Sequence, residues 1–244
     1  MIKTIIFDIG NVLMHFDYMP YVRELLKDES LVYRVNGAIW RSGYWADLDR
    51  GEPVDKIYPK MIEADPELED EIRRTFDNVG QCMHRAEYAI PWIQELKAKG
   101  FQVLYLSNYS EYIMQANPET LDFLPYMDGG VFSCHVHLLK PERAIYQKIC
   151  DEYSLIPQEC VFIDDHEENV QAAKDFGMKS IFFTGYPEAR KELDDLIHRE
   201  KNDELYYAQK HLLETFLERG AISKTQFEKS LHDLTVKMGL ESHA

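Results

Sequence analysis

The stretch IIFDIGNVL, residues 5–13, decides which fold the sequence is expected to adopt. It is an apolar run that ends in a single carboxylate, Asp8, and continues into a turn with Gly10 and Asn11. Apolar runs without alternating polar residues are typical of strands buried on both faces of a parallel sheet. A buried strand that ends on an acid raises the question of function, and Asp8 is our first candidate for a catalytic nucleophile.

Apolar runs of this kind alternate with amphipathic segments of helix length, and they lie at residues 3–8, 101–108, 160–165 and 179–185. Gly100 and Gly177 follow two of these segments, where a helix favours a left-handed residue after its end. Pro141 stands where a third segment is expected to begin its helix. The alternation predicts an α/β fold, a Rossmann-like doubly wound parallel sheet. In such a sheet, ligands bind at the C-terminal ends of the strands.

A long insertion, residues 16–85, interrupts the alternation before the second strand. It is rich in Tyr, Trp, Glu and Leu at helical spacing, so we expect a small helical cap that acts as a lid at the mouth of the sheet. Its aromatic residues are candidates for lining a sugar pocket, although packing within the cap is their more ordinary role: Trp40, Tyr44 and Trp45. The core domain then comprises residues 1–15 and 86–200.

The last part of the chain, residues 201–244, is predicted to form a C-terminal helical extension outside the core. Two amphipathic segments are joined at residues 220–222 and indicate a helical hairpin. Ser223 and Gln226 have the spacing of a capping box at the start of the second helix, and Gly239 is placed to end it. Self-association through this hairpin is one expectation, and packing against the core is the other.

The composition limits the partners of the protein. The chain of 244 residues carries a formal net charge of −16, which disfavours nucleic acid and anionic membranes, because both select basic surfaces. The apolar N-terminal run is shorter than a signal peptide or a membrane helix. The cysteines lack the spacing of metal ligands and are expected to be reduced thiols: Cys82, Cys134, Cys150 and Cys160. We therefore expect an untargeted, soluble, cytoplasmic protein.

Polar residues stand at the C-terminal ends of the predicted strands or at the start of the following helices: Asp8, Ser107, Asn108, Lys140, Asp164 and Asp165. A doubly wound sheet brings these positions to one crevice. Three acids packed together repel one another and raise their pKa values unless a cation neutralises them. Mg²⁺ is the natural ion for a site made only of oxygen ligands. The sequence therefore predicts a magnesium site.

A carboxylate beside such a metal can attack phosphorus and form an aspartyl-phosphate, which splits a difficult hydrolysis into two easier steps. In this interpretation Lys140 holds the nucleophile and neutralises phosphate charge. Ser107, with nearby backbone N–H groups at a helix start, binds the phosphoryl oxygens. The expected substrate is a small phosphorylated metabolite.

The motifs FDIGNVL, LSN, KP and FIDD, in this order, resemble the four motifs of the haloacid dehalogenase superfamily, in its phosphatase branch with a small cap. The resemblance covers roughly residues 1–185 and implies a Rossmann-like core and Mg²⁺. It implies Asp8 as nucleophile, with Ser107, Asn108 and Lys140 binding the substrate. It further implies that the metal is held by the Asp8 carboxylate, the Gly10 carbonyl and Asp165, with Asp164 supporting through water.

Within the superfamily the chain is most similar to the DLGNV-type bacterial sugar-phosphate phosphatases, the group of the α-D-glucose-1-phosphate phosphatase. The stretch WADLDRGEPVDKIYPKM, residues 45–61, resembles the cap of that group. This similarity implies a sugar phosphate as substrate, such as a hexose 1-phosphate.

Gly10 departs from the pattern of the superfamily, in which most phosphatases carry a second Asp two residues after the nucleophile. That Asp protonates the leaving group and then activates water, and general acid catalysis typically contributes about 10²–10⁴-fold. One explanation is a leaving group that needs little protonation, such as an anomeric or acyl phosphate. Another is a substitute acid, with His15, Asp17 or a cap residue as candidates. The third is a protein with little catalytic activity.

Two further hypotheses follow from the same departure. A metal-independent 2-haloacid dehalogenase needs no acid for its halide leaving group, but that branch lacks the acidic pair of Asp164 and Asp165. A non-catalytic binding or assembly protein would retain the core as a scaffold and use the C-terminal hairpin. The polar residues at the strand ends come in four motifs, and together they favour the Mg²⁺-dependent phosphatase.

Overall fold

The structure is a computed structural model, and it describes residues 1–238. Residues 239–244, with the helix end predicted at Gly239, lie outside the described part of the chain. The chain divides into two compact units. One comprises Ile2–Ala189, and the other comprises Arg190 onward together with Met1.

A parallel sheet of five strands forms the centre of the first unit, in the order β5-β4-β1-β6-β7. All four predicted runs are strands: β1 (Thr4–Phe7), β4 (Gln102–Ser107), β6 (Cys160–Asp164) and β7 (Lys179–Phe182). The α/β prediction is confirmed. The edge strand β5 (Gly129–Phe132) was not predicted, because it begins with two glycines and contains only two apolar residues.

The register of the central strands explains how the site assembles. Phe7 of β1 lies level with Tyr105 of β4 and with Ile163 of β6. The next residues, Asp8 and Asp164, therefore lie side by side where β1 and β6 end, and the Asp8 N–H donates to the Ile163 carbonyl at 2.8 Å. Residues that are far apart in sequence are brought together because three neighbouring parallel strands end within two residues of the same level.

Helices α6 (Ala89–Ala98), α9 (Arg143–Tyr153) and α10 (Glu167–Phe176) pack on the sheet. The short helices α7 (Glu111–Ala116) and α8 (Ser133–Val136) follow β4 and β5. Gly177 ends α10 with a left-handed φ of 110°, and Gly100 follows α6 with a φ of 90°, as predicted. The predicted helix start at Pro141 is wrong. The helix begins two residues later, at Arg143, after Glu142 as its N-terminal cap residue, and Pro141 belongs to the loop that carries Lys140.

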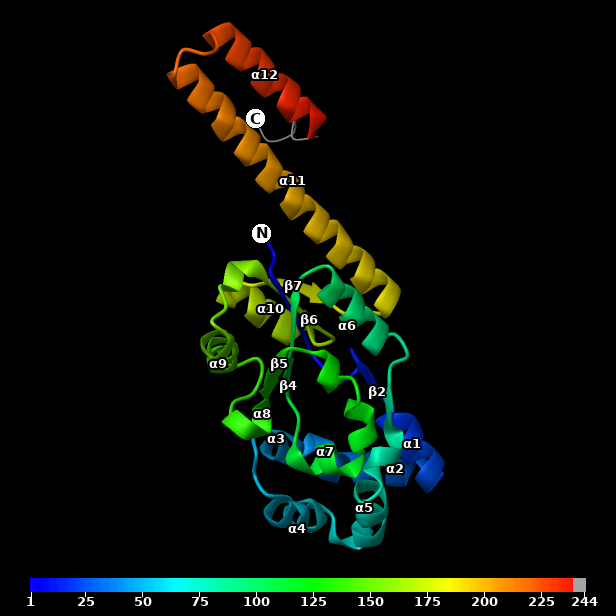
Figure 1. Ribbon diagram of the computed structural model, residues 1–244. Coiled ribbons are helices and arrows are strands. Elements are labelled where there is room, and N and C mark those ends of the chain that lie inside the picture. Colours follow the sequence, from blue (N-terminus) through cyan, green and yellow to red (C-terminus); the bar gives the residue numbers. More distant parts are fainter. Residues whose placement is uncertain (239–244) are drawn as a thin grey trace. The chain divides into compact units, whose positions relative to one another are not determined.

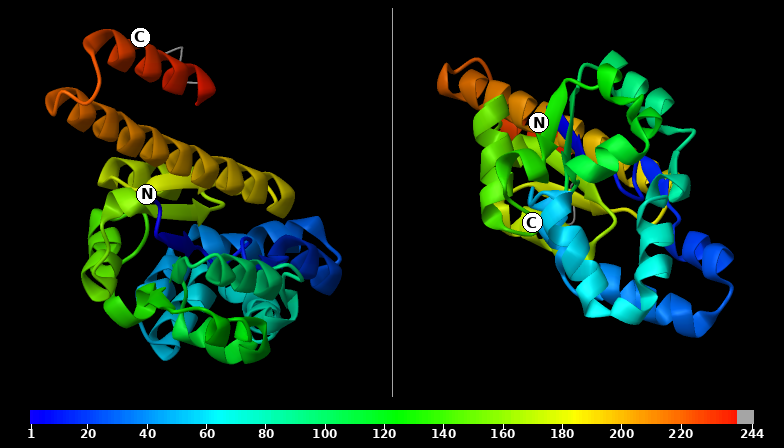
Figure 2. Two further views of the ribbon diagram at one scale, coloured as in Figure 1. Left: turned by 45° about the horizontal axis from the view of Figure 1, so that its top comes forward. Right: turned by 90° about the horizontal axis from the view of Figure 1, so that it is seen from below.

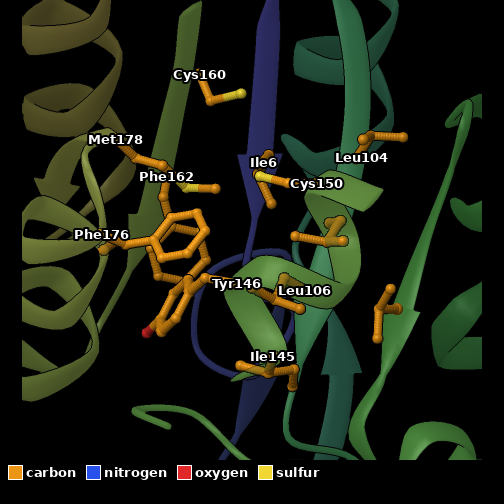
Figure 3. Packing of buried hydrophobic residues seen from close by; sticks show 13 residues of the cluster. Ile6, Leu104, Leu106, Ile145, Tyr146, Cys150, Cys160, Phe162, Phe176 and Met178 are labelled. Atoms are coloured by element: carbon orange, nitrogen blue, oxygen red, sulfur yellow. The ribbon is translucent and has the colours of Figure 1, made fainter. Parts of the chain in front are cut away.

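One apolar cluster fastens α9 and α10 to the face of the sheet (Figure 3). The ring of Tyr146 meets Phe162 of β6 edge to face, with centroids 5.8 Å apart. The Tyr146 hydroxyl also donates to the carbonyl of Asn169, at 3.0 Å. Burial of large side chains such as these contributes about 1.5–3 kcal/mol each. The cluster thus fixes the start of α10, which lies beside the end of β6.

The insertion forms a helical cap at the end of the sheet where the strands terminate (Figure 1). Its helices are α1 (Tyr18–Leu26), α2 (Glu29–Asn36), α3 (Tyr44–Asp49), α4 (Val54–Ala64) and α5 (Glu69–Phe76), with a π-helical turn at Gly37–Arg41. The two links to the core pair as antiparallel strands, β2 (Met14–Phe16) and β3 (Met83–Arg85). The cap has its own apolar cluster, which includes Ile39, Ile57 and Phe76.

A single long helix, α11 (Tyr186–Glu218), continues from the first unit into the second (Figure 2). The boundary predicted between residues 200 and 201 lies inside this helix. The second helix of the extension, α12 (Lys224–Lys237), begins with the predicted capping box of Ser223 and Gln226. No helix within residues 1–238 is long and apolar enough to cross a membrane.

Candidate active site

The Asp8 side chain lies at the C-terminal end of β1 and is 6% exposed. Its Oδ1 accepts the N–H of Ile9 at 2.7 Å and lies 2.9 Å from the Lys140 ammonium. Burial raises the pKa of Asp8 to about 6, against the Lys140 charge that lowers it and the Asp164 charge that adds to the rise. Because Oδ1 already has two donors, Oδ2 is the oxygen left for further chemistry.

Lys140 and Asp164 form a buried ion pair behind Asp8. The Lys140 ammonium lies 2.7 Å from Asp164 Oδ2, and the two side chains are 1% and 0% exposed. Burial disfavours the charged lysine, but the carboxylates of Asp164 and Asp8 outweigh it and raise the pKa of Lys140. The ammonium therefore stays charged beside Asp8.

Asp164 has protein donors on both oxygens. Its Oδ1 accepts the His166 N–H at 2.8 Å and the Asn169 amide at 3.0 Å, and the same amide reaches Oδ2 at 3.2 Å. The Asp164 side chain does not line the cavity that Asp8 faces. Asp164 is therefore placed to position Lys140 and the loop at the start of α10.

Asp165 faces the cavity beside the turn that follows β1. The Asn11 amide donates to Asp165 Oδ2 at 3.1 Å, and Asn11 Oδ1 accepts the N–H of Phe16. Asn11 has a φ of 53°, a left-handed conformation that asparagine tolerates better than most residues. Burial raises the pKa of Asp165. The turn is thereby tied to Asp165 and holds the Gly10 backbone at the cavity.

Three carboxylates at this edge of the sheet can hold a cation, because oxygens of Asp8, Asp164 and Asp165 lie within 4.8 Å of one another. All are hard oxygen donors, the kind that Mg²⁺ prefers. Lys140 offsets part of the charge of the two acids next to it, Asp8 and Asp164. The donor set therefore fits a magnesium ion.

The two polar residues after β4 have different surroundings. Ser107 is 1% exposed and lines the cavity. The Asn108 amide donates to the Lys140 carbonyl at 3.0 Å, and Asn108 Oδ1 accepts the Lys140 N–H at 2.8 Å. Asn108 therefore holds the backbone of the lysine loop in addition to lining the cavity.

A cavity of about 370 Å³ opens between these core residues and the cap. Its cap side is aromatic: Phe16, Trp40 and Trp45 line it, and the two indoles stack with centroids 3.7 Å apart. Trp40 and Trp45 thus combine packing with a place at the cavity, whereas Tyr44 packs on the cap cluster. Phe16 was not singled out from the sequence, because a lone aromatic residue in a link gives no signal.

Sequence reasoning also missed Asp49, a cap carboxyl that lines the cavity and is 9% exposed. Burial raises the pKa of Asp49 to about 8, with the Asp8 charge adding to the rise and Lys140 opposing it. Of the proposed substitute acids, His15 and Asp17 are exposed and do not line the cavity. Of the substitute acids considered from the sequence, a cap residue is the one that remains.

Residues 2–177 match the haloacid dehalogenase-like hydrolase family, so the chain belongs to this family. Its relatives include phosphatases. It is 27% identical over 197 residues to a sesquiterpene phosphatase of Aspergillus oryzae, covering 80% of this chain and 96% of that protein. It is 25% identical over 195 residues to a phosphorylated carbohydrates phosphatase of Thermotoga maritima, covering 74% and 84%.

A drimenol cyclase of Aspergillus calidoustus is 25% identical over 203 residues, which cover 80% of this chain but only 37% of that longer protein. Among solved structures, a predicted hydrolase of the same family from Porphyromonas gingivalis superposes with a TM-score of 0.61 at 19% identity, covering 79% and 98% of the two chains. A Bacteroides thetaiotaomicron family enzyme in complex with magnesium and inorganic phosphate has a TM-score of 0.55 at 17% identity, covering 75% and 94%. These structures support the fold.

Proposed function

We propose that the protein is a Mg²⁺-dependent phosphatase that hydrolyses a small phosphomonoester through an aspartyl-phosphate on Asp8. The observation that carries the proposal is the position of Asp8. Its carboxylate opens into the cavity with Lys140 at 2.9 Å and Asp165 nearby. Family membership and the phosphatase relatives support the same reaction class.

In this proposal the Asp8 and Asp165 carboxylates and the Gly10 carbonyl would hold Mg²⁺, with Asp164 supporting through water, and the ion would neutralise phosphate charge. Asp8 Oδ2 attacks phosphorus, and the bond from phosphorus to the ester oxygen breaks. Lys140 holds Asp8 Oδ1 and contributes positive charge next to the phosphoryl group. The Ser107 hydroxyl donates to a phosphoryl oxygen. Water then attacks the aspartyl-phosphate, which releases phosphate and regenerates Asp8.

The proposed substrate is a small sugar phosphate, such as a hexose 1-phosphate. The indoles of Trp40 and Trp45 offer flat apolar surfaces that suit the carbon face of a sugar ring. The cavity of about 370 Å³ is in the range of small-molecule sites. The Thermotoga maritima relative is named for phosphorylated carbohydrates. The net charge of −16 argues against nucleic acid as a partner.

Phosphate release from a panel of sugar 1-phosphates, sugar 6-phosphates and acetyl phosphate, with Mg²⁺ and with a chelator, tests the proposal. We expect turnover only with Mg²⁺, and an Asp8→Asn variant at background. Asp17→Asn is the matched control, because Asp17 is exposed and outside the cavity. An Asp8→Asn variant with full Mg²⁺-dependent activity would refute the proposal. Halide release from a 2-haloacid without Mg²⁺ would favour the dehalogenase instead.

A further inference from the structure

Cleavage of an alkyl phosphate leaves an alkoxide, which needs a proton as it departs. Gly10, two residues after the nucleophile, has no side chain to supply one. Three titratable residues of the cavity already have a role among the residues that the structure describes. Asp8 is the nucleophile, Lys140 neutralises phosphate charge, and Asp165 is a ligand of the metal. The remaining ones are Asp49, Tyr109, His166 and Glu168.

Three of these remaining residues are poorly suited to donate the proton. Burial raises the pKa of the Tyr109 phenol far above its usual range, and its hydroxyl contacts the sulfur of Met14 at 3.6 Å. His166 and Glu168 lie at the start of α10 on the core side, and both are exposed to solvent. Exposed groups exchange their protons with water and are not held against a leaving group.

Asp49, in contrast to the exposed His166 and Glu168, is a buried carboxyl. It is at the C-terminal end of α3 in the cap, across the cavity from the core, and it is 9% exposed. No hydrogen bond or ion pair of its carboxyl occurs within residues 1–238. The carboxyl opens into the cavity, where a bound substrate can meet it. The rise of its pKa to about 8 keeps a proton available at neutral pH.

The backbone at Asp49 is fastened to the core. The Ser133 hydroxyl donates to the Asp49 carbonyl at 2.5 Å. The next residue, Arg50, donates to Glu142 at 2.5 Å, and the Arg50 carbonyl lies 2.8 Å from His137 Nδ1. These partners belong to the segment that carries Lys140. The cap carboxyl therefore has a defined position relative to the loop that holds the nucleophile.

We propose that Asp49 is the general acid and base of the reaction, supplied by the cap in place of a side chain at residue 10; this inference rests on the proposed phosphatase function. The Asp49 carboxyl gives its proton to the ester oxygen as the bond from that oxygen to phosphorus breaks. The resulting Asp49 carboxylate then takes a proton from the water that attacks the aspartyl-phosphate. The bond from phosphorus to Asp8 breaks, and both carboxyls return to their initial states.

The test compares kcat/KM for two kinds of ester, because this constant reports the step that expels the leaving group. An alkyl phosphate leaves as a strongly basic alkoxide, and 4-nitrophenyl phosphate leaves as a stable phenolate. For Asp49→Asn we expect kcat/KM to fall about 10²–10⁴-fold with the alkyl ester and far less with the aryl ester. Asp47→Asn, on the same helix but outside the cavity, is the matched control and should match wild type.

A second variant separates chemistry from structure. A Cβ at Gly10 meets no atom within 4 Å, so the site has room for a side chain. We expect Gly10→Asp to restore alkyl-ester turnover in the Asp49→Asn background, which the loss of a purely structural contact would not explain.

The outcomes distinguish this inference from the proposed function. If wild type has Mg²⁺-dependent activity and Asp8→Asn has none, the proposed function stands. An Asp49→Asn variant whose kcat/KM is unchanged, or falls equally with both esters, then overturns the role of Asp49 alone. If wild type releases no phosphate from any ester, the proposed function fails, and the role of Asp49 fails with it.

Discussion

The ammonium of Lys140 lies 2.7 Å from Asp164 Oδ2 and 2.9 Å from Asp8 Oδ1. The buried ammonium of Lys140 is therefore shared by Asp164, which positions it, and Asp8, which we assign as the nucleophile. Asp164 in turn is held by Asn169 and by the backbone at His166. The geometry of the nucleophile thus depends on a chain of contacts that begins on α10.

Removal of this shared cation should destabilise the fold as well as abolish activity. In Lys140→Met two buried carboxylates lose their counter-charge, and breaking a buried pair in this way typically costs about 3–5 kcal/mol. Urea unfolding monitored by circular dichroism measures the change. Lys27→Met is the control, because Lys27 is exposed and should change stability by less than about 0.5 kcal/mol. Equal unfolding midpoints for the two variants would contradict the role assigned to Lys140.

Asn169 should matter to activity although we assign it no chemical step. Asn169→Ala removes the amide that contacts both oxygens of Asp164. Loss of such a supporting contact at a metal site typically costs about 10–100-fold in metal affinity or activity. The Mg²⁺ concentration for half-maximal phosphate release and kcat/KM both report the effect. Gln171→Ala, an exposed amide on the same helix, should leave both constants at wild-type values, and a similar response from the two variants would refute the prediction.

The sequence predicted the sheet and the core side of the site for one physical reason. A strand buried on both faces must be almost entirely apolar, so β1, β4, β6 and β7 are visible as apolar runs. Parallel topology then brings their ends together, which is why Asp8, Ser107, Lys140 and Asp165 could be grouped from the sequence alone.

The cap side of the site could not be predicted in this way. Asp47 and Asp49 are two acids on one short helix, and only the packing of the cap on the core buries one of them in the cavity. Phe16 likewise reaches the cavity from the last position of strand β2. Strand β5 was missed because Gly129 and Gly130 remove the apolar signal.

The burial of Asp49 predicts a characteristic pH dependence of stability in the metal-free protein. Its pKa rises from 3.8 to about 8 on folding, so between these values the folded state holds a proton that the unfolded state has lost. Stability therefore falls as pH rises through this window. Asp8 and Lys140, the charged groups that act on Asp49, are common to wild type and variant.

Asp49→Asn cannot ionise and should escape this loss. We expect the variant to be more stable than wild type at pH 8, because the burial that opposes ionisation of Asp49 does not act on a neutral amide. The difference should shrink as the pH is lowered toward 4. Denaturant unfolding across this pH range with a chelator present provides the measurement, with Asp47→Asn as control. A variant less stable than wild type at every pH would show that the Asp49 carboxyl has a stabilising partner.

The C-terminal unit leads to a prediction about self-association. Leu205, Leu212 and Phe216 are exposed on α11, and their spacings of seven and four residues place them on one face of the helix. We expect the protein to sediment with a mass above its 28.7 kDa monomer, because exposed apolar stripes of this kind favour association.

Negative charge introduced on this face of α11 should prevent the association. A double variant, Leu212→Glu with Phe216→Glu, is expected to sediment as a monomer while phosphatase activity stays at the wild-type level. Tyr207→Glu is the matched control, because Tyr207 is an exposed aromatic residue of the same helix that helical spacing places on the opposite face. Analytical ultracentrifugation over a range of concentrations decides the matter. A wild-type protein that stays monomeric at the highest concentration would rule out self-association through α11.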